Sequence, residues 1–220
     1  MERTFYSAAK DGKVEEVKSI LRKNPSLNVN WKNEGDLART ALSAACLNGH
    51  NSVVSILLAH PDIDPNLKNE GRDTPFMKAC FRGYTSCVRL LLQDQRVKVN
   101  EPNNDGVTPL RWAAYCGHSD VRKLWIASGR EMNLGKPGDY WTDAIGVAKE
   151  EKETEVVSLL ERFKSDPAKT RSDVRLELGI TTGKSLSQLI SSLHSVTTFL
   201  GGKTVLTTGG LSFVLSLKSN

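Results

Sequence analysis

The sequence predicts an all-α solenoid, built from helix–turn–helix units that stack along one axis and carry projecting loops. The main observation is a period of 34 residues, marked by threonine at Thr40, Thr74, Thr108 and Thr142. Alanine and glycine keep the same phase, at Ala45, Ala79 and Ala113 and at Gly49, Gly83 and Gly117. A fixed period in this range indicates stacked units, none of which buries its apolar face alone. The function is therefore expected on the surface that the stack presents.

The middle unit shows why each repeat is predicted to form two helices. Thr74 suits a helix N-cap, and Pro75 suits the first helical position, where a missing N–H costs no hydrogen bond. Gly83 is predicted to end this helix, because glycine readily takes the left-handed conformation. The two buried faces come from apolar residues at helical spacing, Phe76, Ala79 and Cys80 in the first helix and Val88, Leu91 and Leu92 in the second.

The third unit carries the most regular form of the pattern, TPLRWAAYCGH from Thr108 to His118. This segment resembles the T-P-L-H-x-A-A-x-x-G-H signature of ankyrin repeats. The segments from Thr40 to His50 and from Thr74 to Tyr84 are degraded copies of it. The resemblance covers about residues 2–165. It implies a protein-binding solenoid in which the first helices and the loop tips line a concave groove.

The chain is expected to contain one ankyrin-repeat domain over residues 1–165, followed by a tail. Three full repeats, at about 31–66, 67–100 and 101–133, lie between degenerate caps at 2–30 and 134–165. The sequence Ser165-Asp166-Pro167 is expected to break the last helix. Residues 166–220, rich in serine, threonine and glycine, are predicted to be a poorly ordered, flexible appendage. One short helix is allowed there by the spacing of Leu186, Leu189, Ile190 and Leu193.

Charge and cysteine content limit the classes of function. After residue 170 there are five Lys or Arg and two acids, so +3 of the net charge of +5 lies in the tail. The remaining +2 is too little to argue nucleic-acid binding from charge. The four cysteines lack the C-x-x-C spacing of metal ligands, and free buried thiols favour an intracellular location, cytoplasmic or nuclear. The uncharged stretch 204–217 is too short for a membrane span.

Neither a catalytic site nor a cofactor or metal site is expected. His50 and His118 occupy the Gly-His phase of the repeat, where the ring is expected to tether neighbouring turns. Residues 178–185, LGITTGKS, resemble a phosphate-binding loop, but three residues instead of four separate the first glycine from Gly-Lys-Ser. Nucleotide binding is therefore not expected.

Asparagine recurs near the loop exits, at Asn66, Asn100 and Asn133. The family resemblance implies that such positions are sometimes hydroxylated. The preferred interpretation is structural, with each amide side chain hydrogen-bonded to its own turn. The two interpretations are compatible.

The predicted partner site lies four, seven and eight residues after the repeat threonine, where the resemblance places the groove. In the second and third repeats these positions hold large aromatic and basic residues. Such side chains dominate the energy of binding sites. The residues expected to bind a partner are Lys78, Phe81, Arg82, Trp112, Tyr115 and Lys149 at these positions, Arg111 one position before Trp112, and Trp141 in a loop tip. The alternative, in which the rings fill the seam between neighbouring repeats, stays open.

The function expected from these observations is that of a non-enzymatic interaction module, an adaptor, scaffold or inhibitor. It would bind another protein or an extended peptide that carries acidic and apolar anchors. The alternative is a nucleic-acid-binding protein in which Lys78, Arg82 and Arg111 contact phosphates and the rings stack on bases. Acidic loop tips count against that alternative. A monomer is expected, as the resemblance implies for short stacks.

Overall fold

The computed structural model describes residues 1–180, and beyond them three strands at 197–200, 203–208 and 211–215. The chain divides into two units, Met1–Ile180 and Thr181–Asn220. In the second unit, β3 (Thr197–Leu200), β4 (Lys203–Thr208) and β5 (Leu211–Leu215) pair antiparallel in that order. Sequence analysis predicted no strands there, although short Thr-, Val- and Leu-rich segments separated by paired glycines are typical of hairpins. The short helix expected around residues 186–193 lies outside the described residues.

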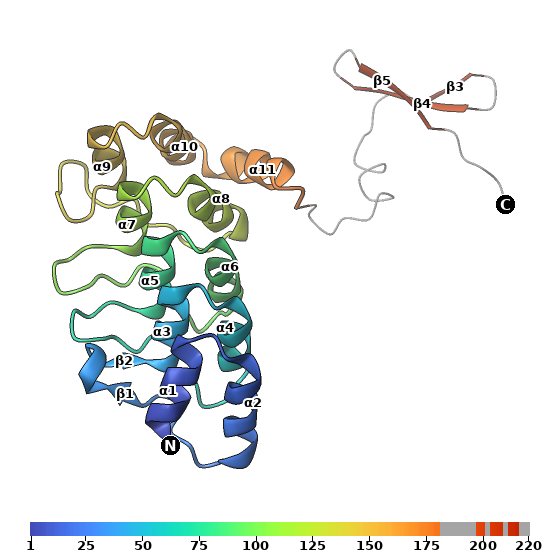
Figure 1. The fold of residues 1–220 in the computed structure, drawn as a ribbon. Coiled ribbons are helices and arrows are strands. Elements are labelled where there is room, and N and C mark those ends of the chain that lie inside the picture. The colour runs from blue at the N-terminus through green and yellow to red at the C-terminus, as the bar shows by residue number, and fades with distance from the viewer. Residues whose placement is uncertain (181–196, 201–202, 209–210, 216–220) are drawn as a thin grey trace. The chain divides into compact units, whose positions relative to one another are not determined.

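Five helix pairs form the stack of the first unit. The first, inner helices of the pairs are α1 (Glu2–Lys10), α3 (Ala41–Asn48), α5 (Pro75–Arg82), α7 (Pro109–Tyr115) and α9 (Ala144–Glu150). The second, outer helices are α2 (Val14–Lys23), α4 (Asn51–Leu58), α6 (Thr85–Gln93), α8 (Ser119–Ser128) and α10 (Thr154–Ser165). Inner helices pack on inner helices and outer helices on outer ones, which gives two columns (Figure 1). The predicted helical solenoid is confirmed.

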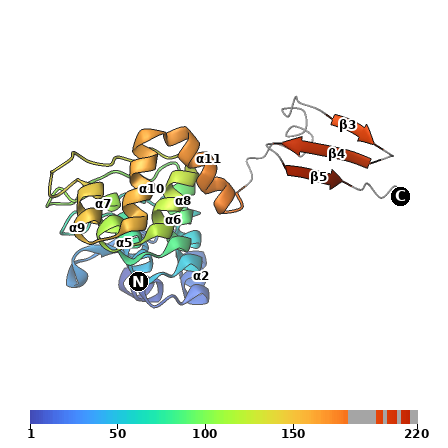
Figure 2. The same ribbon diagram turned by 90° about the horizontal axis from the view of Figure 1, so that it is seen from above.

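Loops project from the inner column between successive helix pairs. The first is a small hairpin, in which β1 (Lys32–Asn33) pairs antiparallel with β2 (Arg39–Thr40) around a 3₁₀ turn at Glu34–Asp36. Backbone hydrogen bonds of 3.0 Å join the next loops, from Glu70 N to Leu37 O and from Asn104 N to Gly71 O. Seen from above, the loops lie on the side of the inner helices (Figure 2). We call this side of the stack, with the loops, the inner face.

The repeat threonines act as helix caps, as predicted. The hydroxyl oxygens of Thr40, Thr74 and Thr108 each accept a hydrogen bond from the backbone N–H three residues on, at 3.2, 3.1 and 3.3 Å. The fourth unit departs from this phase. Asp143, not Thr142, caps α9 by accepting from Gly146 N at 2.8 Å. The first helix of the last pair, α9, therefore begins one residue later than the 34-residue period indicates.

A side chain from each repeat lies over a left-handed glycine of the preceding repeat. The pairs are His50 over Gly12, Tyr84 over Gly49, His118 over Gly83 and Glu153 over Gly117. An added Cβ at any of these glycines would lie 2.5 to 2.9 Å from the covering side chain. The predicted histidine tether is confirmed, since Nε2 of His50 lies 2.9 Å from Lys10 O and Nε2 of His118 lies 3.1 Å from Phe81 O. Only glycine satisfies both the backbone conformation and this contact.

The folded unit continues past residue 165, where sequence analysis placed the start of a flexible tail. Helix α11 (Pro167–Glu177) follows α10 directly and packs against α10 and α8. Thr170 and Val174 are buried in this contact. The prediction of a flexible appendage from residue 166 therefore differs from the structure over this helix.

Two arginines explain why α11 docks. Arg171 Nε donates to Ile126 O at 3.2 Å, and Arg175 Nε donates to Ala127 O at 2.7 Å. Both carbonyls lie in the last turn of α8, where helix carbonyls lack the usual partner four residues on, and Ile126 O also accepts from Gly129 N at 3.3 Å. Two arginines that sequence analysis assigned to a flexible tail thus donate hydrogen bonds to carbonyls at the end of a helix in the stack.

The core contains a charged side chain, Arg122 of α8. It occupies the repeat phase of Val54 and Val88 and is fully buried. Its Nη1 donates to Ala113 O, whereas Nε and Nη2 have no partner among the described residues. Burial lowers the pKa of Arg122 to about 10, so it stays charged at neutral pH. A desolvated cation at a valine position works against stability.

Replacing Gly83 with valine is expected to lower the free energy of unfolding by about 2–5 kcal/mol. About 1–2 kcal/mol comes from the left-handed backbone, at φ +71°, and about 1–3 kcal/mol from the clash with His118. Gly138→Val is the matched control, because Gly138 has φ +78° and nothing within 4 Å of an added Cβ. Urea denaturation measures both. Equal losses would mean that the contact with His118 does not contribute.

Replacing Arg122 with methionine is expected to raise the free energy of unfolding by about 1–4 kcal/mol, because an apolar chain of similar length removes an unpaired buried charge. Ala113 O keeps a hydrogen bond from His118 N at 3.1 Å, so no carbonyl is orphaned. The exposed Arg89→Met is the control and should change stability by less than about 0.5 kcal/mol. Thermal and urea unfolding measure both, and a destabilised Arg122→Met would contradict this account.

Candidate functional site

Six side chains of the inner face form what we call the aromatic–arginine cluster. Its members are Phe81, Arg111, Trp112, Tyr115, Tyr140 and Trp141. Ring centroids lie 5.0 Å apart for Phe81–Trp112, 5.9 Å for Trp112–Tyr115 and 4.7 Å for Tyr140–Trp141, all in edge-to-face geometry. This arrangement is favourable for aromatic pairs. Five of the eight predicted site residues are thus brought together.

The register of the stack produces the cluster. Phe81 of α5 and Tyr115 of α7 are 34 residues apart and hold the same position in adjacent inner helices. Trp112 lies one helical turn before Tyr115, so both rings share a face of α7. Tyr140 and Trp141 come from the loop before α9. That loop is closed by a hydrogen bond of 3.1 Å from Ala144 N to Leu134 O.

Arg111 joins the two groups of rings. Its Nε donates to Tyr140 O at 2.8 Å, and its guanidinium carbon lies 5.0 Å from the ring centroid of Tyr140. The same carbon lies 5.9 Å from the ring of Trp112 and 5.8 Å from that of Tyr115. These are cation–π distances. Arg111 therefore fixes the last projecting loop against helix α7.

The rings differ in how far they reach solvent. Tyr115, Tyr140 and Trp141 are exposed, at 45%, 65% and 47%. Phe81 and Trp112 are half-buried. The alternative in which the rings only fill the seam between repeats fits Phe81 and Trp112 in part, since they pack on each other. It does not account for the three exposed rings.

The basic residues predicted for the site separate into two classes. Lys78 Nζ lies 2.6 Å from Asp73 Oδ2, and Lys149 Nζ lies 2.8 Å from Glu161 Oε1. The hydrogen bond with Glu161 raises the pKa of Lys149. Both lysines are thus paired within the chain, and neither belongs to the cluster. Arg82 is exposed and lies 5.5 Å from the ring of Phe81, with no ion pair within residues 1–180.

Comparison with protein families gives a match over most of the stack. The family model for ankyrin repeats, in three copies, matches residues 3–69 and 61–136. The chain belongs to the ankyrin-repeat family. Comparison with curated proteins gave no match. In ankyrin terms, the aromatic–arginine cluster lies on the first helices of the second and third full repeats and on the loop that follows them.

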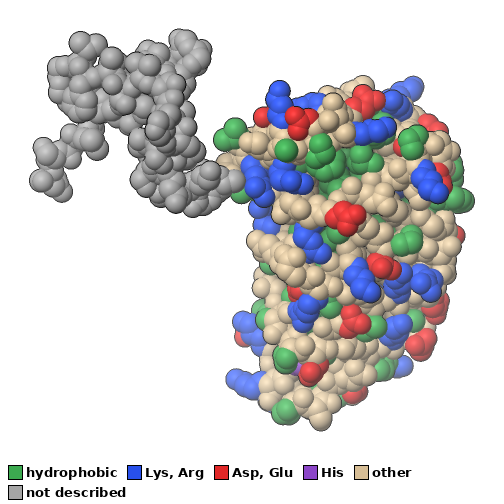
Figure 3. Space-filling view, turned by 180° about the vertical axis from the view of Figure 1, so that it is seen from behind, with side chains coloured by type: hydrophobic (Ala, Val, Ile, Leu, Met, Phe, Trp, Pro, Cys, Tyr) green, Lys and Arg blue, Asp and Glu red, His purple; other side chains and the backbone are tan. Residues whose placement is uncertain are grey.

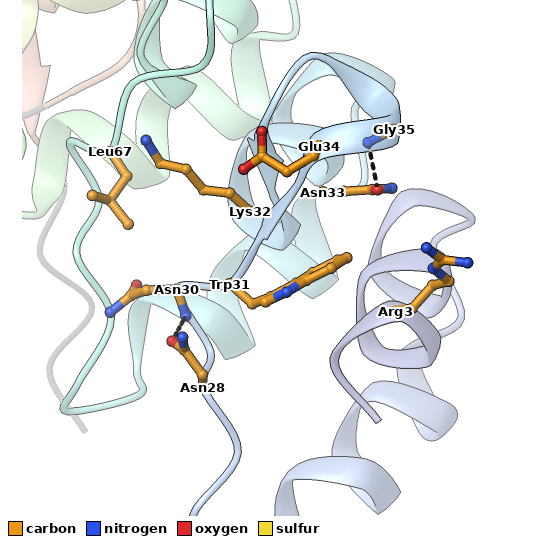
Figure 4. Close-up of a pocket in the computed structure, with 9 residues that line it drawn as sticks. All are labelled: Arg3, Asn28, Asn30, Trp31, Lys32, Asn33, Glu34, Gly35 and Leu67. Carbon is orange, nitrogen blue, oxygen red and sulfur yellow. Dashed lines mark hydrogen bonds between the residues drawn. The ribbon is translucent and has the colours of Figure 1, made fainter.

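The ankyrin stack has a hollow around Trp31 that sequence analysis did not identify. Figure 4 shows the Trp31 ring between Arg3 of α1 and the hairpin that carries Lys32 and Glu34. The hollow has a volume of about 610 Å³, and Trp31 packs edge-on against Tyr6 at 6.2 Å. Trp31 belongs to the first loop, outside the helix positions selected by the threonine phase. The hollow is lined by side chains of both charges, and Trp31 itself is half-buried.

The loop-exit asparagines link successive ankyrin repeats. At Asn30, Asn66 and Asn100 the amide nitrogen donates to a carbonyl of the next loop exit, and the amide oxygen accepts a backbone N–H from it, at 2.7 to 3.4 Å. The prediction that each bonds its own turn is therefore wrong for Asn66 and Asn100, which reach about 30 residues along the chain. It is confirmed for Asn133, which accepts from Gly135 N at 2.9 Å. Hydroxylation stays a prediction.

In the described part of the chain, no group of three or more His, Cys, Asp or Glu side chains is placed to hold a metal ion. Of the helices that the structure describes, none is both long and apolar enough to span a bilayer.

Proposed function

We propose that this ankyrin-repeat protein is a non-enzymatic interaction module that binds another protein or an extended peptide through the aromatic–arginine cluster. Ankyrin repeats are generally protein–protein interaction modules. The observation that carries the proposal is the exposure of Tyr115, Tyr140 and Trp141 beside arginine on one face. Exposed apolar patches mark interaction sites, and aromatic and arginine side chains contribute most to binding energy. An adaptor, scaffold or inhibitor role fits such a surface.

The cluster is held in place before any partner binds. Each ring leans edge-on against a neighbour, and Arg111 ties Tyr140 to α7 by a hydrogen bond of 2.8 Å. Aromatic side chains have few rotatable bonds, so little conformational entropy remains to be lost on binding. This supports a rigid docking surface that selects partners by shape.

The charges favour a protein partner over nucleic acid. A nucleic-acid-binding surface needs cations that are free to contact phosphates. Of the three cations that this alternative requires, Lys78 is paired with Asp73, which leaves Arg82 and Arg111, and Lys149 is paired with Glu161. On the face shown in Figure 3, basic and acidic side chains are interspersed rather than sorted into a basic stripe. Nucleic-acid binding therefore stays the weaker alternative.

We also propose that the protein is monomeric and works inside the cell, in the cytoplasm or the nucleus. The support for the location is the state of its thiols, since Cys46, Cys80, Cys87 and Cys116 are all free. Burial raises the pKa of Cys87 to about 11, which keeps this thiol protonated and unreactive.

The test is affinity capture from cell lysate, with mass spectrometry, using the full chain and two variants. Trp112→Ala/Tyr115→Ala is expected to reduce capture of at least one partner by more than about tenfold, with unchanged far-ultraviolet circular dichroism. Trp31→Ala is the matched control, because it removes a half-buried tryptophan from the hollow of Figure 4 and is expected to leave capture unchanged.

Equal capture by the wild-type protein and the double variant would refute this placement of the site. Loss of capture in Trp31→Ala alone would instead place the binding site at the hollow around Trp31. Nuclease treatment of the lysate separates the alternative function, because a nucleic-acid binder would lose its captured material and its affinity would fall steeply with salt.

A further inference from the structure

Arg111 carries a charge at a position where the repeat does not need one. The same phase holds Ser43 in the first full repeat and Met77 in the second, and both are buried. Arg111 is itself only 6% exposed. A buried cation reduces stability unless an anion or several hydrogen bonds compensate for its lost hydration. The repeat pattern therefore does not require arginine at this position, and the one structural role of Arg111 in the described chain is the hydrogen bond from its Nε that holds the loop at Tyr140.

The guanidinium of Arg111 is incompletely used within the protein. A guanidinium has five N–H donors, and Nε uses one of them on Tyr140 O. Within residues 1–180, no acceptor is hydrogen-bonded to the two terminal nitrogens, and no carboxylate forms an ion pair with them. Unlike Nη2 of Arg122, these nitrogens are not fully buried polar atoms without a partner. They are therefore not completely sealed from solvent, although Arg111 as a whole is only 6% exposed.

The aromatic rings around Arg111 leave those donors free. Contacts with the rings of Trp112, Tyr115 and Tyr140, at 5.0 to 5.9 Å, engage the charge of the guanidinium but not its N–H groups. Because a cation already occupies the space between the rings, the cluster is unsuited to hold a second one from a ligand. An anion would instead find donors and apolar walls together.

The acidic side chains near the cluster include Asp73 and three that line a hollow together with Tyr140, namely Asp139, Asp143 and Glu150. Asp73 pairs with Lys78 at 2.6 Å, and the carboxylate of Asp143 accepts from Gly138 N at 2.7 Å and Gly146 N at 2.8 Å. Arg82, beside Phe81, is a second cation without an ion pair in the described chain. Arg82 and Arg111 thus have no carboxylate paired with them in the described chain, and the carboxylates beside Tyr140 offset part of their charge.

We infer that the aromatic–arginine cluster recognises a carboxylate of the partner, next to an apolar side chain, and that Arg111 is the residue that binds it. The inference rests on the proposed function and names the chemistry of its partner, an acidic and apolar peptide segment. Arginine matches a carboxylate with two parallel hydrogen bonds, which a lysine does not. Tyr115, Tyr140 and Trp141 supply the contact for the apolar neighbour, and Arg82 adds charge beside Phe81.

The probe is a displayed library of random 12-residue peptides, selected on the full chain. Selected sequences are expected to be enriched in Asp or Glu beside an aliphatic or aromatic residue. The best peptide is then synthesised with its Glu or Asp and with the matching amide. Changing the carboxylate to the amide is expected to weaken binding to the wild-type protein by about tenfold or more.

Three protein variants locate the effect. Arg111→Gln is expected to lose about tenfold in affinity for the carboxylate peptide and little for the amide peptide. Arg82→Gln removes an exposed charge and is expected to have a smaller effect in the same direction. Arg89→Gln, on outer helix α6, makes the same change of charge away from the cluster and is expected to change nothing.

Some outcomes overturn the inference and others overturn the proposed function. Peptides that depend on Trp112 and Tyr115 but show no acidic preference would refute the carboxylate and leave the proposed function standing. Peptides that bind equally without those two rings would refute both. Arg111→Gln could also lower affinity by loosening the loop at Tyr140. The comparison of the carboxylate peptide with the amide peptide avoids this problem, because both are measured on the wild-type protein.

Discussion

The contact between a left-handed glycine and a side chain of the next repeat fixes the register of the whole stack. Gly12, Gly49 and Gly83 each lie under a ring, and Gly117 lies under the carboxylate of Glu153. The missing Cβ lets neighbouring turns approach closely, and the two histidines add hydrogen bonds across the gap. With the register fixed, residues 34 apart in sequence become neighbours in space. That is how Phe81 and Tyr115, with Trp112 beside them, form a row of rings across α5 and α7.

Much of this follows from the sequence, because local chemistry repeats with the period. Threonine caps, left-handed glycines and the apolar phases of both helices depend on residues close to one another in the chain. The structure confirms them, apart from the cap of α9, which is Asp143 instead of Thr142. The departures need information from distant residues. Helix α11 docks because Arg171 and Arg175 reach carbonyls 45 and 48 residues earlier. The 34-residue period does not continue after residue 165, so the sequence pattern did not indicate that contact.

The candidate site shows the same division. The family resemblance, applied at fixed distances from the repeat threonine, predicted Phe81, Trp112 and Tyr115 as site residues, and the period brings them to one face. The sequence offered no means to distinguish the basic residues of the predicted site from one another. In the structure, Lys78 is paired with Asp73, whereas Arg82 has no ion pair in the described chain. The link between Tyr140 and α7 through Arg111 depends on a loop geometry that no repeat signature encodes. Whether these residues bind a partner stays a proposal.

Two buried arginines break the apolar pattern of the stack in different ways. Arg122 is sealed, and two of its nitrogens have no partner in the described residues. The terminal nitrogens of Arg111 are not completely sealed, and its guanidinium lies beside the exposed rings of Tyr115 and Tyr140. Local violations of a folding pattern are expected at functional sites, where stability is lost for the sake of binding. We place Arg111 in that class, whereas nothing in the structure connects Arg122 with an accessible surface.

The most direct test of the central claim is hydrogen–deuterium exchange of the full chain, with and without a bound partner or selected peptide. If the inner face around α7 is the binding surface, exchange will slow in residues 109–115 and 136–142 and stay unchanged in outer helices α6 and α8. Protection confined to the outer helices, or to the hairpin around Trp31, would contradict the account.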